Sequence, residues 1–252
     1  MSGHSKWATI HRQKGVADQK RGQVFTKLGR AITIAVREGG GVVDPEANAK
    51  LRVAIEKAKA ANMPKDNIQR AIKRGSGEVG GEKWEEMTYE GYGPEQVGII
   101  VECLTDNRQR AAQEIKNIFD KNGGNLAGPG AVSFQFEKSG FLTIAKPGNV
   151  EETILKVMDI EGVTDVEEAS DVIEVYTHPG EIEKVKQELK GLGLEVTLEE
   201  LTLKPKVAVS ITDKQKAQKL LDLMERLEDL DEVQKVYANF DIPEEIVKLL
   251  NG

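Results

Sequence analysis

The residues best suited to chemistry are cations clustered near the start of the chain. Positive side chains along a tail and one helix face can neutralise successive phosphates of a nucleic acid and release its counterions. An aromatic side chain among them could stack on an unpaired base, or pack as part of a helix or core. An ordinary solvated face is the alternative for the cations. The candidate nucleic-acid-binding residues are Lys6, Trp7, His11, Arg12, Lys14, Lys20, Arg21, Lys27 and Arg30.

The distribution of charge agrees with this interpretation. Residues 1–80 hold 16 Lys+Arg against 7 Asp+Glu, a net of +9, whereas residues 81–252 hold 19 against 35, a net of −16. Such a split is typical of a protein whose basic part meets a polyanion, although two solvated surfaces can also differ by chance. Residues 137–200 carry a net of −10 and should turn away from phosphate, toward solvent or a basic protein partner.

The sequence contains no recognisable catalytic or metal-binding constellation. The three histidines lie far from the single cysteine in sequence, and neither HExxH nor CxxC occurs. GxSxG is also missing, and paired carboxylates indicate little in a chain with 42 acids. We therefore expect no enzyme activity, no metal and no cofactor.

The single cysteine, Cys103, lies within an apolar run at 97–104. It should be a packing residue and not a nucleophile. One cysteine excludes an intrachain disulfide, which favours a reducing cytoplasm. No apolar run approaches the ~18 residues that cross a bilayer, and the polar start lacks the apolar core of a signal peptide. We expect a cytoplasmic protein without membrane contact.

Helices should position the basic side chains. Apolar residues recur at helical spacing in 18–38, and further helices are expected at 45–60 and at 64–75, the last with proline in its first turn. The glycine-rich stretch 75–81 predicts a linker that acts as a hinge. Four cations of the first helix fall on one arc beside its apolar face: Lys20, Lys27, Arg30 and Arg37.

The remainder of the chain predicts mixed α and β structure. Within 141–199 the patterns follow the ferredoxin-like order β-α-β-β-α-β. On either side lies a strand–helix–strand piece, at 97–104, 107–122 and 131–136, and at 206–211, 213–230 and 233–238.

Two loops leave alternatives open. The Gly/Pro-rich stretch 87–94 contains two tyrosines and is either a functional loop or a turn at a domain seam. The glycine-rich stretch 123–130 follows a helix and lacks a GK[ST] ending, which favours a tight connection over a phosphate loop.

Each flanking piece is too small to bury a core alone, so the two should pair into one sheet. We predict an α+β protein with two ferredoxin-like α/β domains after a helical domain. The expected boundaries are 1–80 for the basic helical domain, 81–136 plus 201–252 for a discontinuous domain, and 137–200 for an inserted acidic domain. A row of three separate domains is the alternative.

Several segments match a known family closely. They are MSGHSKWATI at the start, KRGQVFTKLGRAI at 20–32, NMPKDNIQRAIKRGSG at 62–77, YEGYGP at 89–94, LTDNR at 104–108, the glycine loop at 123–132 and the end at 227–243. With these segments the chain resembles the YebC/PmpR family, which includes the mitochondrial translational activator of cytochrome oxidase subunit one. Residues 126–133, LAGPGAVS, depart from that family's LGxxGSVx pattern.

The resemblance implies a helical domain followed by two α/β domains, and a regulator that is not an enzyme. It implies a DNA-binding transcriptional regulator or, alternatively, a ribosome-associated translation factor that contacts ribosomal RNA and eases synthesis of proline runs. A protein-interaction module without nucleic acid is disfavoured by the clustered positive charge. We therefore expect a nucleic-acid-binding regulator of gene expression.

Overall fold

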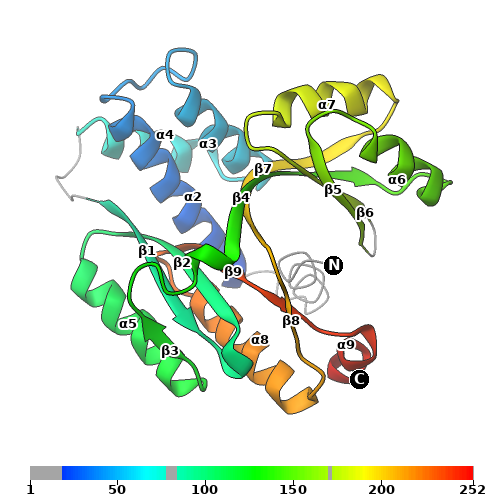
Figure 1. Cartoon of the computed structure of the whole chain (residues 1–252). Coiled ribbons are helices and arrows are strands. Elements are labelled where there is room, and N and C mark those ends of the chain that lie inside the picture. Colours follow the sequence, from blue (N-terminus) through cyan, green and yellow to red (C-terminus); the bar gives the residue numbers. More distant parts are fainter. Residues whose placement is uncertain (1–18, 78–83, 170–171, 252) are drawn as a thin grey trace.

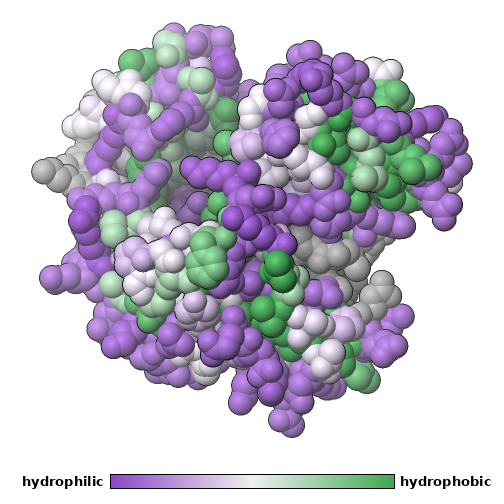
Figure 2. Space-filling model, viewed as in Figure 1, coloured by the Kyte–Doolittle hydropathy of each residue, from purple (hydrophilic) through white to green (hydrophobic). Residues whose placement is uncertain are grey.

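The computed structural model describes residues 19–77, 84–169 and 172–251. Its elements form three groups in Figure 1: blue and cyan helices, a first sheet whose helices are green and orange, and a second sheet with green and yellow helices. Figure 2 shows hydrophilic side chains over most of the visible face of these groups. None of the helices in the described residues is long and apolar enough to cross a membrane.

The first group consists of three helices whose apolar faces meet. Ile32 and Val36 of the first helix and Leu51 of the second are fully buried in one cluster. The second helix begins later than the predicted residue 45, because the Asn48 side chain caps it by accepting the Leu51 N–H at 3.1 Å. The helices are α2 (Gln19–Glu38), α3 (Ala49–Ala60) and α4 (Lys65–Gly75).

Gly75 allows α4 to pack closely against α2. A Cβ atom at Gly75 would lie 2.6 Å from the Thr33 carbonyl oxygen and 2.6 Å from Val36 Cβ. Gly75 is therefore a buried helix residue, and the predicted linker 75–81 cannot begin there. Residues 78–81 of that linker lie outside the described part of the chain.

The first sheet joins strands from distant parts of the sequence. Its order is β3-β1-β2-β9, with antiparallel neighbours throughout. Apolar side chains from one sheet face form a shared core with α5 (Arg108–Lys121) and α8 (Lys214–Glu228). The strands are β1 (Glu85–Tyr92), β2 (Gly98–Thr105), β3 (Asn125–Ala127) and β9 (Val233–Ala238).

The second sheet has the ferredoxin-like arrangement. Its order is β5-β6-β4-β7, all antiparallel, and α6 (Val150–Met158) and α7 (Ile182–Gly191) share a core with one of its faces. The predicted fold class, a helical domain followed by two α/β domains, is confirmed. The strands are β4 (Phe136–Ala145), β5 (Val163–Glu168), β6 (Val172–Thr177) and β7 (Val196–Pro205).

The stretch 87–94, predicted as a loop, is mostly strand. β1 extends to Tyr92, and only the short 3₁₀ turn η1 (Pro94–Gln96) separates it from β2. Gly91 lies within this strand, and it has to be a glycine because α5 packs directly on the strand at this point. A Cβ atom at Gly91 would lie 2.7 Å from Phe119 Cε1. The prediction was wrong because close packing, and not turn formation, explains this glycine.

The prediction of a strand at 131–136 is also wrong. The chain there forms the 3₁₀ turn η2 (Ser133–Gln135) and enters β4 only at Phe136. The buried carboxylate of Glu90 accepts the N–H groups of Gly130, Val132 and Ser133 at 2.8, 2.7 and 2.9 Å. These donors are consequently unavailable to a strand partner.

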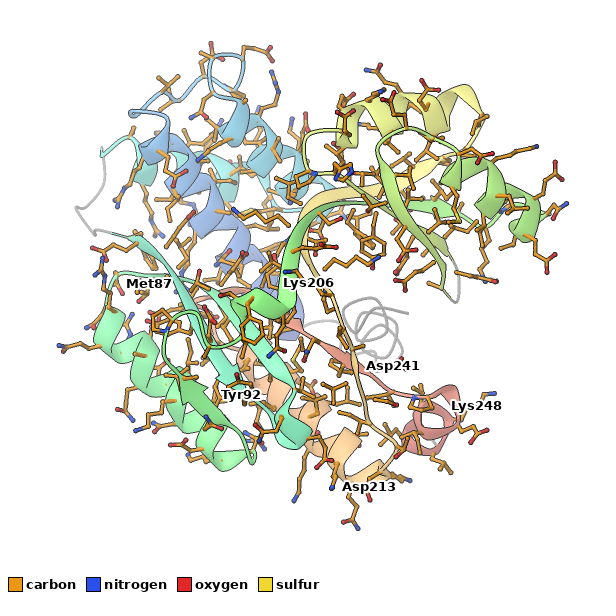
Figure 3. The ribbon with its side chains drawn as sticks, viewed as in Figure 1. Met87, Tyr92, Lys206, Asp213, Asp241 and Lys248 are labelled. Atoms are coloured by element: carbon orange, nitrogen blue, oxygen red, sulfur yellow. The ribbon has the colours of Figure 1, made fainter. Side chains whose placement is uncertain are left out.

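The strand predicted at 206–211 is shorter than expected. Only β8 (Val209–Ser210) forms, paired in parallel with β10 (Phe240–Asp241), and the C-terminal helix α9 (Glu244–Asn251) follows. Between the two large sheets, the Lys206 N–H donates to the Gln135 carbonyl at 2.8 Å, so the outgoing and returning chains lie together. Figure 3 labels Lys206 at this crossing.

Asn239 fixes the crossing to the first sheet. Its Oδ1 accepts the Gly98 N–H at 2.7 Å, and its Nδ2 donates to Gln135 Oε1 at 2.6 Å. Its carbonyl accepts the Val209 N–H at 2.7 Å. The buried side-chain amide of Asn239 therefore connects β2 to the crossing, and its backbone carbonyl connects to β8.

Candidate nucleic-acid interface

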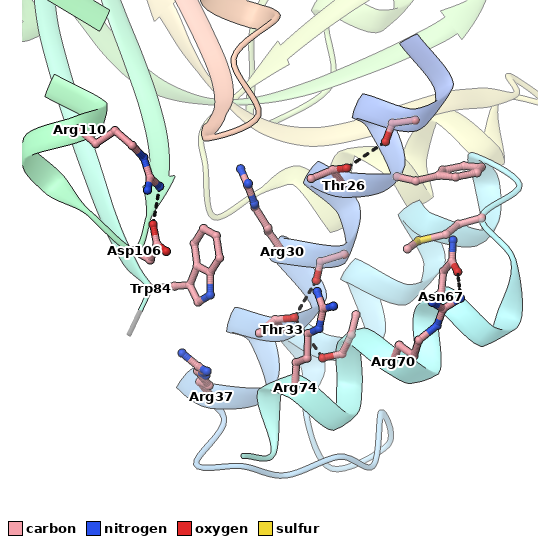
Figure 4. A pocket seen from close by; sticks show the side chains of 15 residues that line it. Thr26, Arg30, Thr33, Arg37, Asn67, Arg70, Arg74, Trp84, Asp106 and Arg110 are labelled. Atoms are coloured by element: carbon pink, nitrogen blue, oxygen red, sulfur yellow. Dashed lines mark hydrogen bonds and ion pairs between the residues drawn. The ribbon is translucent and has the colours of Figure 1, made fainter. Parts of the chain in front are cut away.

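A cleft of about 820 Å³ lies between the helical group and the first sheet. Figure 4 shows α2 and α4 on one side and Trp84, Asp106 and Arg110 on the other. Five guanidinium groups and one carboxylate line it, which makes it strongly basic. Its lining residues are Gly22, Phe25, Thr26, Gly29, Arg30, Thr33, Arg37, Met63, Asn67, Arg70, Ala71, Arg74, Trp84, Asp106 and Arg110.

α2 contributes a stripe of small residues to the floor of the cleft. Thr26 Oγ1 donates to the Gly22 carbonyl at 3.1 Å, and Thr33 Oγ1 donates to the Gly29 carbonyl at 2.9 Å. Because the helix backbone engages both hydroxyl protons, the stripe presents mainly backbone and methyl groups. The long side chains of Arg30 and Arg37 are therefore the charged groups that α2 brings to the cleft.

α4 contributes a polar face from its amphipathic pattern. Asn67, Arg70 and Arg74 are three and four residues apart, which places them on one side of the helix, while Ile68 and Ala71 are buried. Arg70 Nη2 donates to Asn67 Oδ1 at 2.6 Å. Arg70 and Arg74 are exposed and line the cleft.

Arg30 lies over the Trp84 ring. Its Cζ is 4.8 Å from the ring centroid, a cation–π contact that joins α2 to the residue just before β1. Its Nη1 is buried and has no hydrogen-bond partner among the described residues. A buried donor of this kind is normally satisfied, so Nη1 can serve a ligand that enters the cleft.

Arg110, on the opposite wall, is already neutralised. It donates to Asp106 Oδ1 at 2.6 Å and to the Glu232 carboxylate. The hydrogen bond that Arg110 donates to Glu232, followed by the one that it donates to Asp106, raises the pKa of Arg110 above its ordinary value. The excess positive charge of the cleft therefore does not come from Arg110, and α2 and α4 supply the other arginines that line it.

The structure places only part of the predicted nucleic-acid-binding set. Arg30 lies in the cleft. Lys20 and Arg21 belong to the first turn of α2, where only the backbone is described. The predictions for Lys6, Trp7, His11, Arg12 and Lys14 fall in residues 1–18, outside the described part of the chain.

Lys27 does not line the cleft. Its Nζ donates to the carbonyl oxygen of Glu228 at the last residue of α8. Burial lowers the pKa of Lys27, although the charges of Glu228, Asp229 and Asp231 oppose this shift. A cation near a helix C-terminus is favourable, so Lys27 ties α2 to the first sheet's helix.

Several lining residues were absent from the predicted site. Arg70 and Arg74 had a sequence signal, because they sit four residues apart opposite Ile68 and Ile72 in the helix predicted at 64–75. Arg37 is one of the four cations on the predicted basic arc of the first helix. Trp84 and Arg110 had no such signal, since they reach the cleft only through packing of the helical group on the first sheet.

Cys103 is a packing residue, as its apolar surroundings predict. It is 2% exposed, and burial together with the charge of Glu232 raises its pKa to about 12. It therefore stays a thiol near neutral pH. Within the described residues, no group of three or more His, Cys, Asp or Glu side chains could hold a metal ion.

Two family models together match most of the chain. Residues 5–78 match the model described as the TACO1/YebC protein N-terminal domain, and residues 84–240 match the TACO1/YebC second and third domain. A crystal structure of a conserved hypothetical protein from Aquifex aeolicus is also similar, with a TM-score of 0.79 and 45% identity, covering 91% of this chain and 93% of that chain.

Full-length relatives agree with these matches. A protein of Persephonella marina is 50% identical over 249 residues, which cover 98% of this chain and 99% of the relative. A protein of Moorella thermoacetica is 49% identical over 254 residues, with 100% of both chains covered. Each relative is named "Probable transcriptional regulatory protein".

Proposed function

Because the chain belongs to the TACO1/YebC family, we propose that it is a regulator of gene expression that binds nucleic acid and catalyses no reaction. The names of its relatives support a role in transcription. We propose DNA as its ligand and the cytoplasm as its location. The observation that carries the proposal is the arginine-lined cleft between the helical group and the first sheet.

The chemistry of this cleft suits phosphate. Guanidinium groups present several donors in a planar fork and form the strongest hydrogen bonds to phosphate oxygens. Arg30, Arg37, Arg70 and Arg74 line the same cavity from two helices. If these four neutralise four phosphates, log K falls against log[salt] with a slope of about −3.6 for duplex or about −2.8 for single strands.

Two double variants test the cleft in the full chain. Arg70→Gln with Arg74→Gln removes two cleft charges, whereas Arg52→Gln with Lys59→Gln removes two exposed charges of α3 that do not line the cleft. We expect the first pair to weaken nucleic-acid binding at least tenfold, measured by fluorescence anisotropy, and to reduce the salt slope by about 1.4 to 1.8. Equal losses in both pairs would place the site elsewhere.

A translation factor that contacts ribosomal RNA is the second candidate. The concave shape of the cleft favours it, since a DNA major groove receives a protruding helix, whereas RNA is read largely through splayed, unpaired bases. Sequencing of nucleic acid crosslinked to the protein in cells separates the two functions. Promoter DNA supports transcription, and ribosomal RNA fragments support translation.

The acidic part of the chain suggests a second partner. The stretch 137–200, with its net charge of −10, falls within the second sheet and its helices. Such a surface is repelled by phosphate within roughly one Debye length, about 8 Å at physiological salt. We propose that it faces a basic protein partner, such as a ribosomal or polymerase subunit, while the cleft holds nucleic acid.

A further inference from the structure

The cleft contains an aromatic side chain, Trp84, that phosphate contacts do not explain. It lines the same cavity as the arginines, together with Phe25 and Met63 from the edge of the helical group's core. A duplex presents phosphates outward and hides the faces of its bases, so it offers these side chains little to contact. An unpaired base offers both a π-face and an edge, which suits an aromatic and guanidinium lining.

The size of the cleft points in the same direction. A cavity of about 820 Å³ falls within the range of roughly 300–1,000 Å³ that encloses a drug-sized molecule. One or two nucleotides match this range, whereas a double helix does not. Because α2 and α4 face Trp84 and Arg110 across the cavity, a strand that enters meets groups on both sides.

The Trp84–Arg30 pair supplies a stacking surface with a buried, unpartnered hydrogen-bond donor. The guanidinium is held over the half-buried indole, so its plane is fixed before a ligand arrives. Planar guanidinium groups themselves stack on bases. The unpartnered Nη1 of Arg30 is then available to a base carbonyl or a phosphate oxygen.

We propose that the cleft binds an unpaired segment of nucleic acid, with one base stacked against the Trp84–Arg30 pair and neighbouring phosphates on Arg70 and Arg74. This proposal rests on the proposed function and names the form of its ligand. Single-stranded DNA and single-stranded RNA share the required chemistry.

Affinities of the full chain for three matched probes test the proposal. They are a single-stranded RNA, a single-stranded DNA of the same sequence and the corresponding DNA duplex. Stacking on an aromatic side chain contributes roughly 1–3 kcal/mol per base, so Trp84→Leu should weaken single-strand binding by about 5- to 150-fold and duplex binding far less. Trp84→Phe keeps a ring and should retain most of the affinity. Thermal unfolding shows whether each variant is folded.

Tryptophan emission gives a second measurement that does not depend on a Trp84 variant folding. The chain has two tryptophans, so Trp7→Phe leaves Trp84 as the only one, and the affinity of that protein is its own reference. We expect single strands to quench Trp84 emission and the duplex to leave it unchanged. Stronger quenching by RNA or by DNA then identifies the preferred sugar.

The failure of this proposal can be distinguished from failure of the cleft itself. Duplex binding as tight as single-strand binding, with Trp84 emission unaffected by either single strand, would overturn the unpaired-strand proposal. If the Arg70 and Arg74 substitutions still weaken both, the cleft remains the site. If those substitutions have no effect on any probe, the site lies elsewhere and both proposals fall.

Discussion

At the scale of single residues, one buried carboxylate shapes the loop that follows α5. Glu90 is 7% exposed and accepts three backbone N–H groups from the turn at 130–133. Burial opposes its ionisation, but the hydrogen bonds from Val132, Gly130 and Ser133 outweigh burial, so its pKa is lowered. The glycine-rich loop is therefore held by an acid on β1, which supports a structural role for it.

This arrangement predicts a stability that depends on pH. Because the pKa of Glu90 is lower in the folded state, its contribution is present above the unfolded value of about 4.5 and is lost as pH falls through the lowered folded value. Glu90→Gln should lower the free energy of unfolding by about 1–3 kcal/mol at pH 7, and this difference should shrink on acidification. Urea unfolding at a series of pH values measures it.

Glu86 provides the control for this prediction. It lies exposed on the same strand, so Glu86→Gln should change the free energy of unfolding by less than about 0.5 kcal/mol. Equal effects of the two substitutions would show that the backbone contacts of Glu90 contribute nothing to stability.

At the scale of elements, the cleft depends on how closely α2 and α4 approach each other. Gly75 lets the end of α4 touch the backbone of α2 at Thr33. The Thr33 hydroxyl proton is shared between the Gly29 carbonyl of α2 and the Ala71 carbonyl of α4, which lies 3.1 Å from Oγ1. Arg74 precedes Gly75 directly, and Arg37 lies one turn beyond Thr33 on α2. The distance between α2 and α4, which these small residues set, thus determines how far Arg37 of α2 lies from Arg74 of α4.

A methyl group at Gly75 should disturb this packing. Gly75→Ala is expected to lower the free energy of unfolding by about 1–3 kcal/mol, because the added carbon overlaps backbone that cannot move aside. Gly191 is the matched control, since it is also the last residue of a helix and a Cβ there meets nothing within 4 Å. Gly191→Ala should be neutral or stabilise by up to about 1 kcal/mol. Chemical denaturation compares the two, and equal stabilities would contradict the close contact.

At the scale of the whole molecule, opposite charges are separated between groups of elements. The basic arginines lie on α2 and α4, whereas the second sheet and its helices include the strongly acidic stretch 137–200. The chain enters the second sheet from η2 into β4 and leaves it from β7 toward β8. These two connecting segments are held together by the Lys206–Gln135 hydrogen bond, and Asn239, directly after β9 of the first sheet, bonds to Gln135. Nucleic acid bound in the cleft would contact the helical group and the first sheet.

Crosslinking can map this division in the intact protein. After irradiation of a complex with a photoreactive oligonucleotide, we expect modified peptides from α2, α4 and the segment around Trp84, and none from 137–200. The expectation follows from attraction by the cleft and repulsion by the acidic stretch. Abundant crosslinks within 137–200 would contradict the proposed separation of roles. Omitting irradiation gives the background.

The sequence alone determined the local elements, because side-chain periodicity is a local property. Local sequence patterns located α2, α4, α5, α8 and β9. The order of these patterns was enough to predict the fold class. The sequence patterns mispredicted the backbone where a contact between distant residues determines it. Gly91 of β1 makes room for Phe119, so the segment predicted as a loop is a strand. Glu90 accepts the N–H groups of the segment at 130–133, so the strand predicted there does not form.

The candidate site was decided by tertiary structure. Its residues come from α2, α4 and the segment 84–110, and no spacing within one element relates Arg30 to Trp84. The sequence indicated that α2 carries cations but could not show that Lys27 turns to the end of α8 while Arg30 enters the cleft. Neighbouring cations on one helix differ in role because the partner surface, which lies far away in sequence, determines which of them becomes buried and which faces a ligand.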